Sequence, residues 1–289
     1  LVQLPLPTHI SKEKIINALK QYIDTLPKSS LKDAIGYALL AGGKRLRPHL
    51  MLEVIEGYGL NSEPYLPVSI SLEMLHTYSL IHDDLPSMDN DTLRRGKPTL
   101  HIAFNEGLAI LAGDALLTDS FQVITQSNIL NDVQKKTLVD ILSKKTGSHG
   151  MIYGQVLDLE SEGKSITLET LNKMYAYKTA NLLQASLMFG AAIASPKDIS
   201  MWETLGYELG LLFQIQDDVL EETSTIEKMG KSKTDTVRDK PTYVSLIGLE
   251  ASQHEMSRLS SSIRQTLKEL SLDDKPITAL IESIIKRDV

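Results

Sequence analysis

Cysteine is absent from the 289 residues of this chain, which excludes disulfide bonds and thiolate metal sites. The chain also has no excess of basic residues, because 30 Lys and Arg stand against 37 Asp and Glu, for a net charge of −7. A nucleic-acid-binding protein usually carries a basic surface. The charge balance therefore argues against a nucleic-acid partner.

Long apolar runs are missing as well. No uninterrupted run approaches the roughly 18 residues that a membrane-spanning helix needs, so we expect no stable membrane insertion. The opening stretch LVQLPLPTHISKEK lacks the basic start and continuous apolar core of a signal peptide. Together these features predict a cytoplasmic protein. With 42% hydrophobic residues, the chain can bury a large core, as one large domain or two small ones.

Strand signals are weak, since there is no sustained alternation of apolar and polar residues and no Asn-Gly hairpin. Apolar residues instead recur at helical spacing. The predicted helical segments are residues 15–23, 50–58, 64–81, 107–130, 133–159, 168–193 and 202–220. The last two are apolar on more than one face, as central helices of a bundle are. No linker or repeat interrupts the chain, so we predict one all-α domain over residues 1–289.

The stretch LIHDDLPSMDNDTLRRGKPTLH, residues 80–101, places four aspartates within nine positions: Asp83, Asp84, Asp89 and Asp91. An exposed loop could carry these charges without any function. However, apolar helical sequence leads directly into the first pair, which predicts that Asp83 and Asp84 end a buried helix. Carboxylates packed this closely repel one another unless a cation neutralises them.

A second acidic stretch, FQIQDDVLEE, covers residues 213–222. Asp217 and Glu221 are four positions apart and leave one face of a helix, with Asp218 beside them. Taken alone, this could be an ordinary helix end with exposed acids. Two such clusters, without cysteine and without an HExxH pair, fit Mg²⁺ or Mn²⁺ better than zinc. Because Mg²⁺ commonly binds through one or two carboxylates and substrate phosphates, we expect a phosphorylated ligand.

Basic residues that could bind phosphate occur in several places. The stretch GGKRLRP, residues 42–48, offers Lys44, Arg45 and Arg47 beside a glycine pair, without the spacing of a Walker loop. The other candidates are Arg94, Arg95, Lys178, Lys231, Lys233 and Lys240. Any one of them could be a solvated surface cation. The hypothesis of a phosphate site depends on the set.

These motifs together resemble those of the trans-isoprenyl diphosphate synthases. DDLPSMDNDTLRRGKPT is similar to the first aspartate-rich motif of that family, including its Pro-Ser insertion, and FQIQDDVLE is similar to the second. GGKRLRP, AYKTANLL and GKSKTDTVRDKPTY resemble its other signatures, so the likeness extends over residues 42–243. It implies an all-α, single-domain bundle of about ten or more helices around a deep central cavity. It also implies a homodimer.

The resemblance implies a role for each matching residue. Asp83 and Asp89 would hold two Mg²⁺ ions with Asp84 in support, and Asp217 a third, with Mn²⁺ able to substitute. Residues that would bind the allylic diphosphate are Arg94, Lys178, Lys231 and Lys240. Residues that would bind isopentenyl diphosphate are Lys44, Arg47, His76 and Arg95. Thr179 and Gln214 would line the reacting centre. Glu221, Ala180 and a loop one residue short at 230–240 depart from the usual family pattern.

The motifs are most similar to those of bacterial farnesyl-forming members, which condense isopentenyl diphosphate with dimethylallyl and geranyl diphosphate. Three alternatives remain: a geranylgeranyl diphosphate synthase, a terpene cyclase, and a non-catalytic regulatory subunit. Cyclases commonly lack the GGKRLRP and RRG sites, and regulatory subunits tend to lose one aspartate motif. This chain retains all of them, which favours chain elongation.

Tyr78 is the candidate for control of product length. On a helix it would lie five residues, about 7.5 Å, before Asp83. It could be an ordinary core tyrosine. In the family, however, farnesyl-forming members carry an aromatic residue at this position and longer-chain members a smaller one. We therefore expect Tyr78 to stop the growing chain at fifteen carbons.

Overall fold

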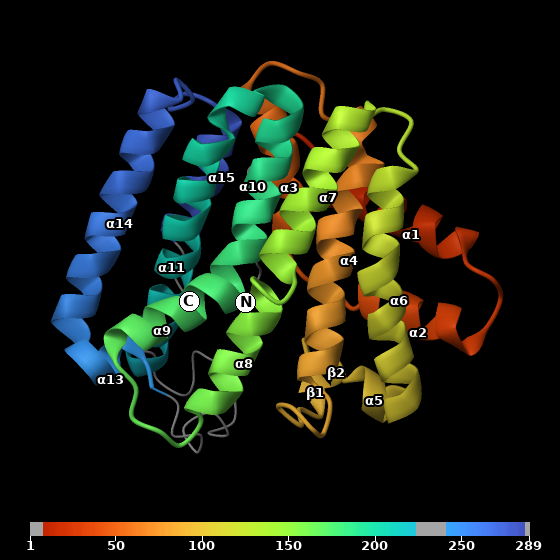
Figure 1. The fold of residues 1–289 in the computed structure, drawn as a ribbon, viewed down its shortest axis with the longest axis horizontal. Helices are drawn as coiled ribbons and strands as arrows, with labels where there is room; N and C mark the ends of the chain where they lie inside the picture. The colour runs from red at the N-terminus through yellow and green to blue at the C-terminus, as the bar shows by residue number, and fades with distance from the viewer. Residues whose placement is uncertain (1–7, 224–240, 287–289) are drawn as a thin grey trace. The chain divides into compact units, whose positions relative to one another are not determined.

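The computed structural model describes residues 8–223 and 241–286. About 12 helices make up nearly all of the secondary structure in these residues, which confirms the predicted all-α class. Two compact units can be distinguished (Figure 1). The N-terminal unit is Thr8–Val139, and the C-terminal unit consists of the described residues from Asp140 onwards. The single domain over residues 1–289 stays a prediction.

The N-terminal unit is built from helices joined by one short hairpin. Its elements are α1 (Lys12–Thr25), α2 (Ser30–Leu39), α3 (Leu46–Gly57), η1 (Glu63–Tyr65), α4 (Leu66–Asp83), β1 (Leu93–Arg94), β2 (Lys97–Pro98), α5 (Leu100–Ala103) and α6 (Glu106–Thr125). α7 (Asp132–Thr146) continues into the C-terminal unit.

The C-terminal unit contains the remaining helices of the described residues. They are α8 (Met151–Ser161), α9 (Leu168–Tyr175), the π-helical turn η2 (Ala176–Ala180), α10 (Asn181–Ala194), η3 (Pro196–Asp198), α11 (Ile199–Thr223), α13 (Tyr243–Ile247), α14 (Leu249–Glu269) and α15 (Pro276–Ile285). α10 packs along α11, and α11 packs in turn on α14. As predicted, α10 is buried on all sides from Asn181 to Ile193.

α4 is the central helix of the N-terminal unit. Pro67 stands in its first turn, where the missing N–H costs nothing. The helix packs on α6, with which it lies side by side in Figure 1, and on α3 and α1. Its residues from Val68 to Leu75 are all buried. Because the apolar sequence runs to Ile81, the helix carries its last residue, Asp83, to the edge of this core.

The hairpin between β1 and β2 was not predicted. Arg94 pairs with Lys97, and the two-residue turn between them is Arg95-Gly96. Both turn residues have positive φ, 53° and 76°, as a type I′ turn requires. Arginine rarely occupies such a position. Because the turn is Arg-Gly and not the usual Asn-Gly, the hairpin had no recognisable signal in the sequence. The turn places Arg94 beside Asp84 at the end of α4 and Arg95 beside Gly42.

Other differences from the predicted helices have local causes. The segment predicted as one helix, 133–159, is two helices, because the chain turns at Gly147–Gly150. At Gly150 an added Cβ would overlap the Lys145 carbonyl group, so only glycine fits. The segment predicted at 168–193 is continuous but contains the wide turn η2. α2, α14 and α15 were not predicted.

One helix among the described residues is long and apolar enough to cross a membrane. α6 has an 18-residue window with a mean hydropathy of 1.3, of which 33% is buried. Asp114 and Asp119 interrupt this segment, which is why it did not count as an uninterrupted apolar run. A single helix of this kind is weak evidence, because core helices of soluble proteins have the same length and composition.

Candidate active site

The first aspartate motif forms a closed loop at the end of α4. The Asp89 backbone N–H donates to the Asp83 carbonyl at 2.8 Å, and the Asn90 N–H donates to the Leu85 carbonyl at 3.0 Å. Asn90 adopts the left-handed region, with a φ of 52°, that a short Asx residue tolerates. The loop therefore joins the backbones of Asp83 and Asp89, although five residues separate them in sequence.

Asp84 points away from solvent and pairs with Arg94. The Arg94 Nε and Nη2 atoms lie 2.7 and 2.6 Å from the same Asp84 oxygen, Oδ1. Asp84 is 3% exposed, and this burial raises its pKa while the guanidinium opposes the rise. Nη2 also lies 3.4 Å from Asp91 Oδ2. Asp84 is thus held by Arg94, and its supporting role in metal binding stays a prediction.

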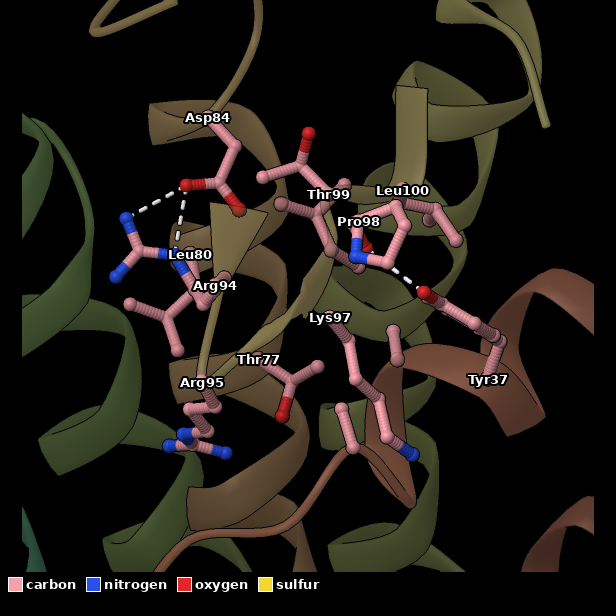
Figure 2. Close-up of a pocket in the computed structure, with 13 residues that line it drawn as sticks. Tyr37, Thr77, Leu80, Asp84, Arg94, Arg95, Lys97, Pro98, Thr99 and Leu100 are labelled. Atoms are coloured by element: carbon pink, nitrogen blue, oxygen red, sulfur yellow. Dashed lines mark hydrogen bonds and ion pairs between the residues drawn. The ribbon is translucent and has the colours of Figure 1, made fainter. Parts of the chain in front are cut away.

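A pocket in the N-terminal unit lies between the hairpin, α4 and the end of α2. Figure 2 shows Asp84, Arg94, Arg95 and Lys97 among its lining residues. The Tyr37 hydroxyl donates to the Pro98 carbonyl at 2.8 Å and fixes the second strand of the hairpin on α2. Three positive side chains of the hairpin and one buried carboxylate therefore line the same pocket.

The GGKRLRP stretch contributes to this region in two ways. Arg95 Nη1 donates to the Gly42 carbonyl at 2.5 Å, and its guanidinium occupies the space where a Cβ at Gly43 would lie. Lys44 is exposed. Arg45, a phosphate candidate from the sequence, instead turns into the core, pairs with Glu73 at 2.5 Å and is 2% exposed. Arg45 thus has a structural partner and is not available to a ligand.

Three residues predicted to bind isopentenyl diphosphate lie close enough to affect one another's pKa values. Loss of hydration and the charges of Arg47 and Arg95 hold the pKa of His76 well below its usual value, so His76 is neutral at pH 7. Loss of hydration lowers the pKa of Arg47 to about 10, which leaves it charged. The structure therefore brings Arg47, His76 and Arg95 together within one unit, with Lys44 at the adjoining loop.

Tyr78 lies inside the N-terminal unit and is 6% exposed. Burial and the negative charge of Asp83 raise the pKa of its hydroxyl to about 12. The phenol is therefore neutral and close enough to Asp83 to experience its charge.

In the C-terminal unit the wide turn η2 carries Lys178 and Thr179. Lys178 Nζ donates to Asp158 Oδ2 of α8 at 2.6 Å. The Thr179 hydroxyl donates to the side-chain oxygen of Gln214 on α11. π-helical turns occur frequently at functional sites. The structure thus brings together Thr179 and Gln214, and it adds Asp158, which sequence reasoning missed although it lies in the polar GQVLDLE stretch.

The second aspartate motif divides between surface and core. Asp217 is half-buried on α11, one turn after Gln214. Asp218 is 9% exposed and accepts from the Tyr175 hydroxyl at 2.7 Å and from the Tyr243 backbone N–H at 2.8 Å. Burial raises the pKa of Asp218 to about 6. Asp218 is therefore a packing residue that joins α9, α11 and α13, and it does not share the exposure of Asp217.

Lys231, Lys233 and Lys240 lie outside the described residues, as does the shortened loop at 230–240.

The carboxylate side chains of the aspartate motifs suit a hard cation such as Mg²⁺. No three His, Asp or Glu side chains converge into a finished metal site in the described part of the chain. Mg²⁺ does not need one, because it keeps several waters and binds proteins through one or two carboxylates plus substrate phosphates. Asp83 and Asp89, joined by the loop backbone, supply two such carboxylates.

Comparison with known proteins identifies the family to which this chain belongs. The sequence model of the polyprenyl synthetase family matches residues 28–278, most of the chain. The chain belongs to the polyprenyl synthetase family. It is therefore a prenyltransferase, as the sequence predicted.

Individual members of the polyprenyl synthetase family resemble it over nearly their whole length. The farnesyl diphosphate synthase of Micrococcus luteus is 45% identical, with 90% of each chain covered. That of Bacillus subtilis is 43% identical, with 96% of each covered. A geranylgeranyl diphosphate synthase from Cyanophora paradoxa is 44% identical, with 98% of this chain and 99% of the relative covered.

Solved structures of the family share the fold. An FPP/GFPP synthase from Zymomonas mobilis superposes with a TM-score of 0.83 at 31% identity, covering 95% of this chain and 96% of the other. A geranyltransferase from Helicobacter pylori, in complex with magnesium and isoprenyl diphosphate, has a TM-score of 0.81 at 34% identity and the same coverage. The second structure supports the use of Mg²⁺ in this family.

Proposed function

We propose that this polyprenyl synthetase is a Mg²⁺-dependent farnesyl diphosphate synthase. It condenses isopentenyl diphosphate with dimethylallyl diphosphate and then with geranyl diphosphate, and it releases diphosphate at each step. The observation that supports the proposal is that the N-terminal unit contains two groups of charged side chains, each of which suits a diphosphate. One is the Asp83–Asp89 loop with Arg94, which would bind the anion through Mg²⁺, and the other is the cationic group of Arg47 and Arg95 beside the neutral His76. Chain elongation needs two diphosphate sites.

The allylic diphosphate is assigned to the aspartate motifs. Asp83 and Asp89 would hold two Mg²⁺ ions and Asp217 a third, with Mn²⁺ as a substitute. When bound, these ions neutralise charge on the departing diphosphate as Lewis acids. Arg94, Lys178, Lys231 and Lys240 are assigned to the same leaving group from the family motif, and each would add positive charge. Asp84 and Asp158 keep Arg94 and Lys178 oriented until a ligand is present.

The second substrate is assigned to the cationic group. Lys44, Arg47 and Arg95 would bind the diphosphate of isopentenyl diphosphate through charge-assisted hydrogen bonds. Neutral His76 can donate a hydrogen bond from its ring. Binding in this place holds the terminal double bond at a fixed distance from the reacting carbon, which removes most of the entropic cost of a two-substrate reaction.

The bond changes follow from this placement. The allylic C1–O bond breaks, and its electron pair leaves with diphosphate. C4 of isopentenyl diphosphate then bonds to C1, and a proton from C2 passes to the departing diphosphate. The side-chain oxygens of Thr179 and Gln214 are assigned to the surroundings of the allylic cation, which partial negative charge stabilises.

A geranylgeranyl diphosphate synthase is the second candidate, because the 44% identical relative from Cyanophora paradoxa is named as one. Purified protein with Mg²⁺, geranyl diphosphate and labelled isopentenyl diphosphate decides between them. We expect C15 diphosphate as the main product. Chiefly C20 product would favour the geranylgeranyl alternative, a cyclic hydrocarbon would favour a cyclase, and no product would favour a regulatory subunit. A homodimer and a cytoplasmic location stay predictions, testable by sedimentation and by cell fractionation.

A further inference from the structure

His82 has no assigned role so far, yet it stands directly before Asp83 on α4. Its side chain is 27% exposed and lies against α6. The Nε2 atom is 3.1 Å from the carbonyl oxygen of Ile110. Because a carbonyl oxygen only accepts, Nε2 carries the ring proton and donates it. The same nitrogen lies 4.0 Å from Asp114 Oδ1. The ring is thus anchored to the backbone of α6.

Gly113 provides the space for this ring. A Cβ built at Gly113 would overlap three ring atoms of His82: Nε2, Cδ2 and Cε1. Glycine is unfavourable within a helix relative to alanine, and Gly113 lies in the middle of the 20-residue α6. Gly107, on the same helix, differs, because a Cβ there meets only Asn105 Oδ1 at an ordinary 3.5 Å. Of these two glycines of α6, Gly113 is the one that a packed side chain requires.

The other side of the His82 ring contacts Tyr78. The two residues are four apart on α4, and their ring centroids are 5.5 Å apart at 87°, an edge-to-face pair. Tyr78 is buried, so its ring can change position only if a neighbour moves. His82 is such a neighbour, and its own position is fixed by Ile110 and by the gap at Gly113.

We propose that His82 is a positioning residue for product length: it holds the Tyr78 ring in place, and it can do so because Gly113 leaves α6 open to receive its imidazole. The inference rests on the proposed function and extends it. In this arrangement three residues from two helices, Tyr78, His82 and Gly113, together limit the length to which the product can grow. A change at Gly113 would act on the product through His82 and Tyr78.

Four variants test the inference: His82→Ala, Gly113→Ala, the double variant of these two, and Gly107→Ala as the matched control. The readout is the ratio of C20 to C15 product, measured with geranyl diphosphate and excess labelled isopentenyl diphosphate. A merely structural residue changes yield or melting temperature and leaves this ratio unaltered. We expect His82→Ala and Gly113→Ala each to raise the ratio about fivefold or more, the size of a lost aromatic contact. Gly107→Ala should keep the wild-type ratio.

The double variant is the sharpest part of the test. Once the imidazole is gone, a methyl group at position 113 has no ring to displace. We therefore expect the double variant to give a ratio no higher than that of His82→Ala alone. A ratio equal to the product of the two single effects would show that Gly113 acts independently of His82 and would overturn the proposal.

Two further substitutions separate the ring from its hydrogen bond and remain informative if His82→Ala does not fold. His82→Phe keeps a ring beside Tyr78 without the donor, whereas His82→Gln keeps a donor without the ring. We expect the C20 to C15 ratio to rise more in His82→Gln than in His82→Phe. An unchanged ratio in His82→Gln and Gly113→Ala, with condensation retained, overturns the inference alone. Absence of condensation by the wild-type protein overturns the proposed function and the inference with it.

Discussion

Arg94 binds Asp84 through two nitrogens that converge on one carboxylate oxygen, at 2.6 and 2.7 Å. The acid is almost fully buried, whereas the side chain of Arg94 is 33% exposed. The pair therefore has a buried end that orients it and an open end that can meet a ligand. It connects the hairpin to the end of α4, so the two halves of the first aspartate motif act as one piece.

This connection predicts strong coupling between the two residues. Arg94→Ala and Asp84→Ala should each reduce kcat/KM for geranyl diphosphate, and the double variant should be no worse than the poorer single variant. The coupling energy should be about 1.5–3 kcal/mol, the range for a hydrogen bond to a charged group. Additive losses would show that the residues act separately. Arg94→Lys, which keeps the charge and loses the two-nitrogen contact, serves as the reference.

The neighbouring arginines should differ in the substrate that they affect. Arg95→Ala is expected to raise the KM for isopentenyl diphosphate, and Arg94→Ala the KM for the allylic substrate, because each loses a charge-assisted contact. The expected increase is roughly ten- to a hundredfold. Steady-state kinetics with each substrate varied in turn provide the test. Equal weakening for both substrates in both variants would contradict the division into two diphosphate sites.

Metal removal should abolish condensation. We expect EDTA to stop the reaction and added Mg²⁺ to restore it, because carboxylates and diphosphates repel one another without a cation. Asp83→Ala and Asp217→Ala should each lose on the order of 10²-fold or more in kcat. Glu222→Ala, an exposed acid on the same helix as Asp217, is the control and should retain activity. Near-normal turnover in a folded Asp83 or Asp217 variant would contradict their assignment as ligands.

Replacing Tyr78 should lengthen the product. Tyr78→Ala removes a buried ring and leaves room for another five-carbon unit, which a packed core could not otherwise absorb. We expect the main product to shift from C15 to C20 or longer, with condensation retained, when products are separated after incubation with excess isopentenyl diphosphate. A main product that stays at C15 would show that another residue limits the product length.

The stability of the N-terminal unit should depend on His49. Burial, and secondarily the charge of Lys12, lower the pKa of His49 to about 4, whereas an unfolded histidine titrates near 6.5. The unfolded state therefore binds more protons between these values. The contribution of His49 is complete above pH 6.5 and is lost as the pH falls towards 4.

Urea unfolding at pH 7 and pH 5 measures this effect. The wild-type protein should lose about 2 kcal/mol more of its free energy of unfolding than His49→Gln over this interval. His254→Gln, which changes an exposed histidine on α14, should behave as wild type. An identical pH dependence in wild type and His49→Gln would contradict the assignment.

Structural features that depend on local sequence pattern could be predicted from the sequence. Helical periodicity placed Asp83 at the end of a buried helix, because the apolar stripe of α4 continues to Ile81. Thr179 and Gln214 were predicted on the family motif to share a site, and the structure joins them by a hydrogen bond. Roles that were implied by matched motifs, such as Mg²⁺ ligation by Asp217, stay predictions.

Features that depend on packing were not accessible from the sequence. Nothing in the RLR sequence of the glycine stretch distinguishes Arg45 from Arg47, yet a left-handed backbone at Arg45, with a φ of 57°, turns it towards Glu73. Asp218 resembles Asp217 in sequence, but one position along a helix rotates its side chain by about 100° and into the core. The partner of His82 likewise became visible only with the position of α6.

The turn η2 is an insertion of one residue into an otherwise regular helical segment. Ala176–Ala180 makes a wide turn between α9 and α10, where a regular helix would use one residue fewer. Deleting a single residue there would restore regular geometry while α9 and α10 keep the faces that they bury, so the displacement would fall on the residues of the turn itself. One residue along a helix changes the direction of a side chain by about 100°, so Lys178 and Thr179 would turn away from Asp158 and Gln214. The contacts of both residues therefore depend on the length of this turn as well as on its side chains.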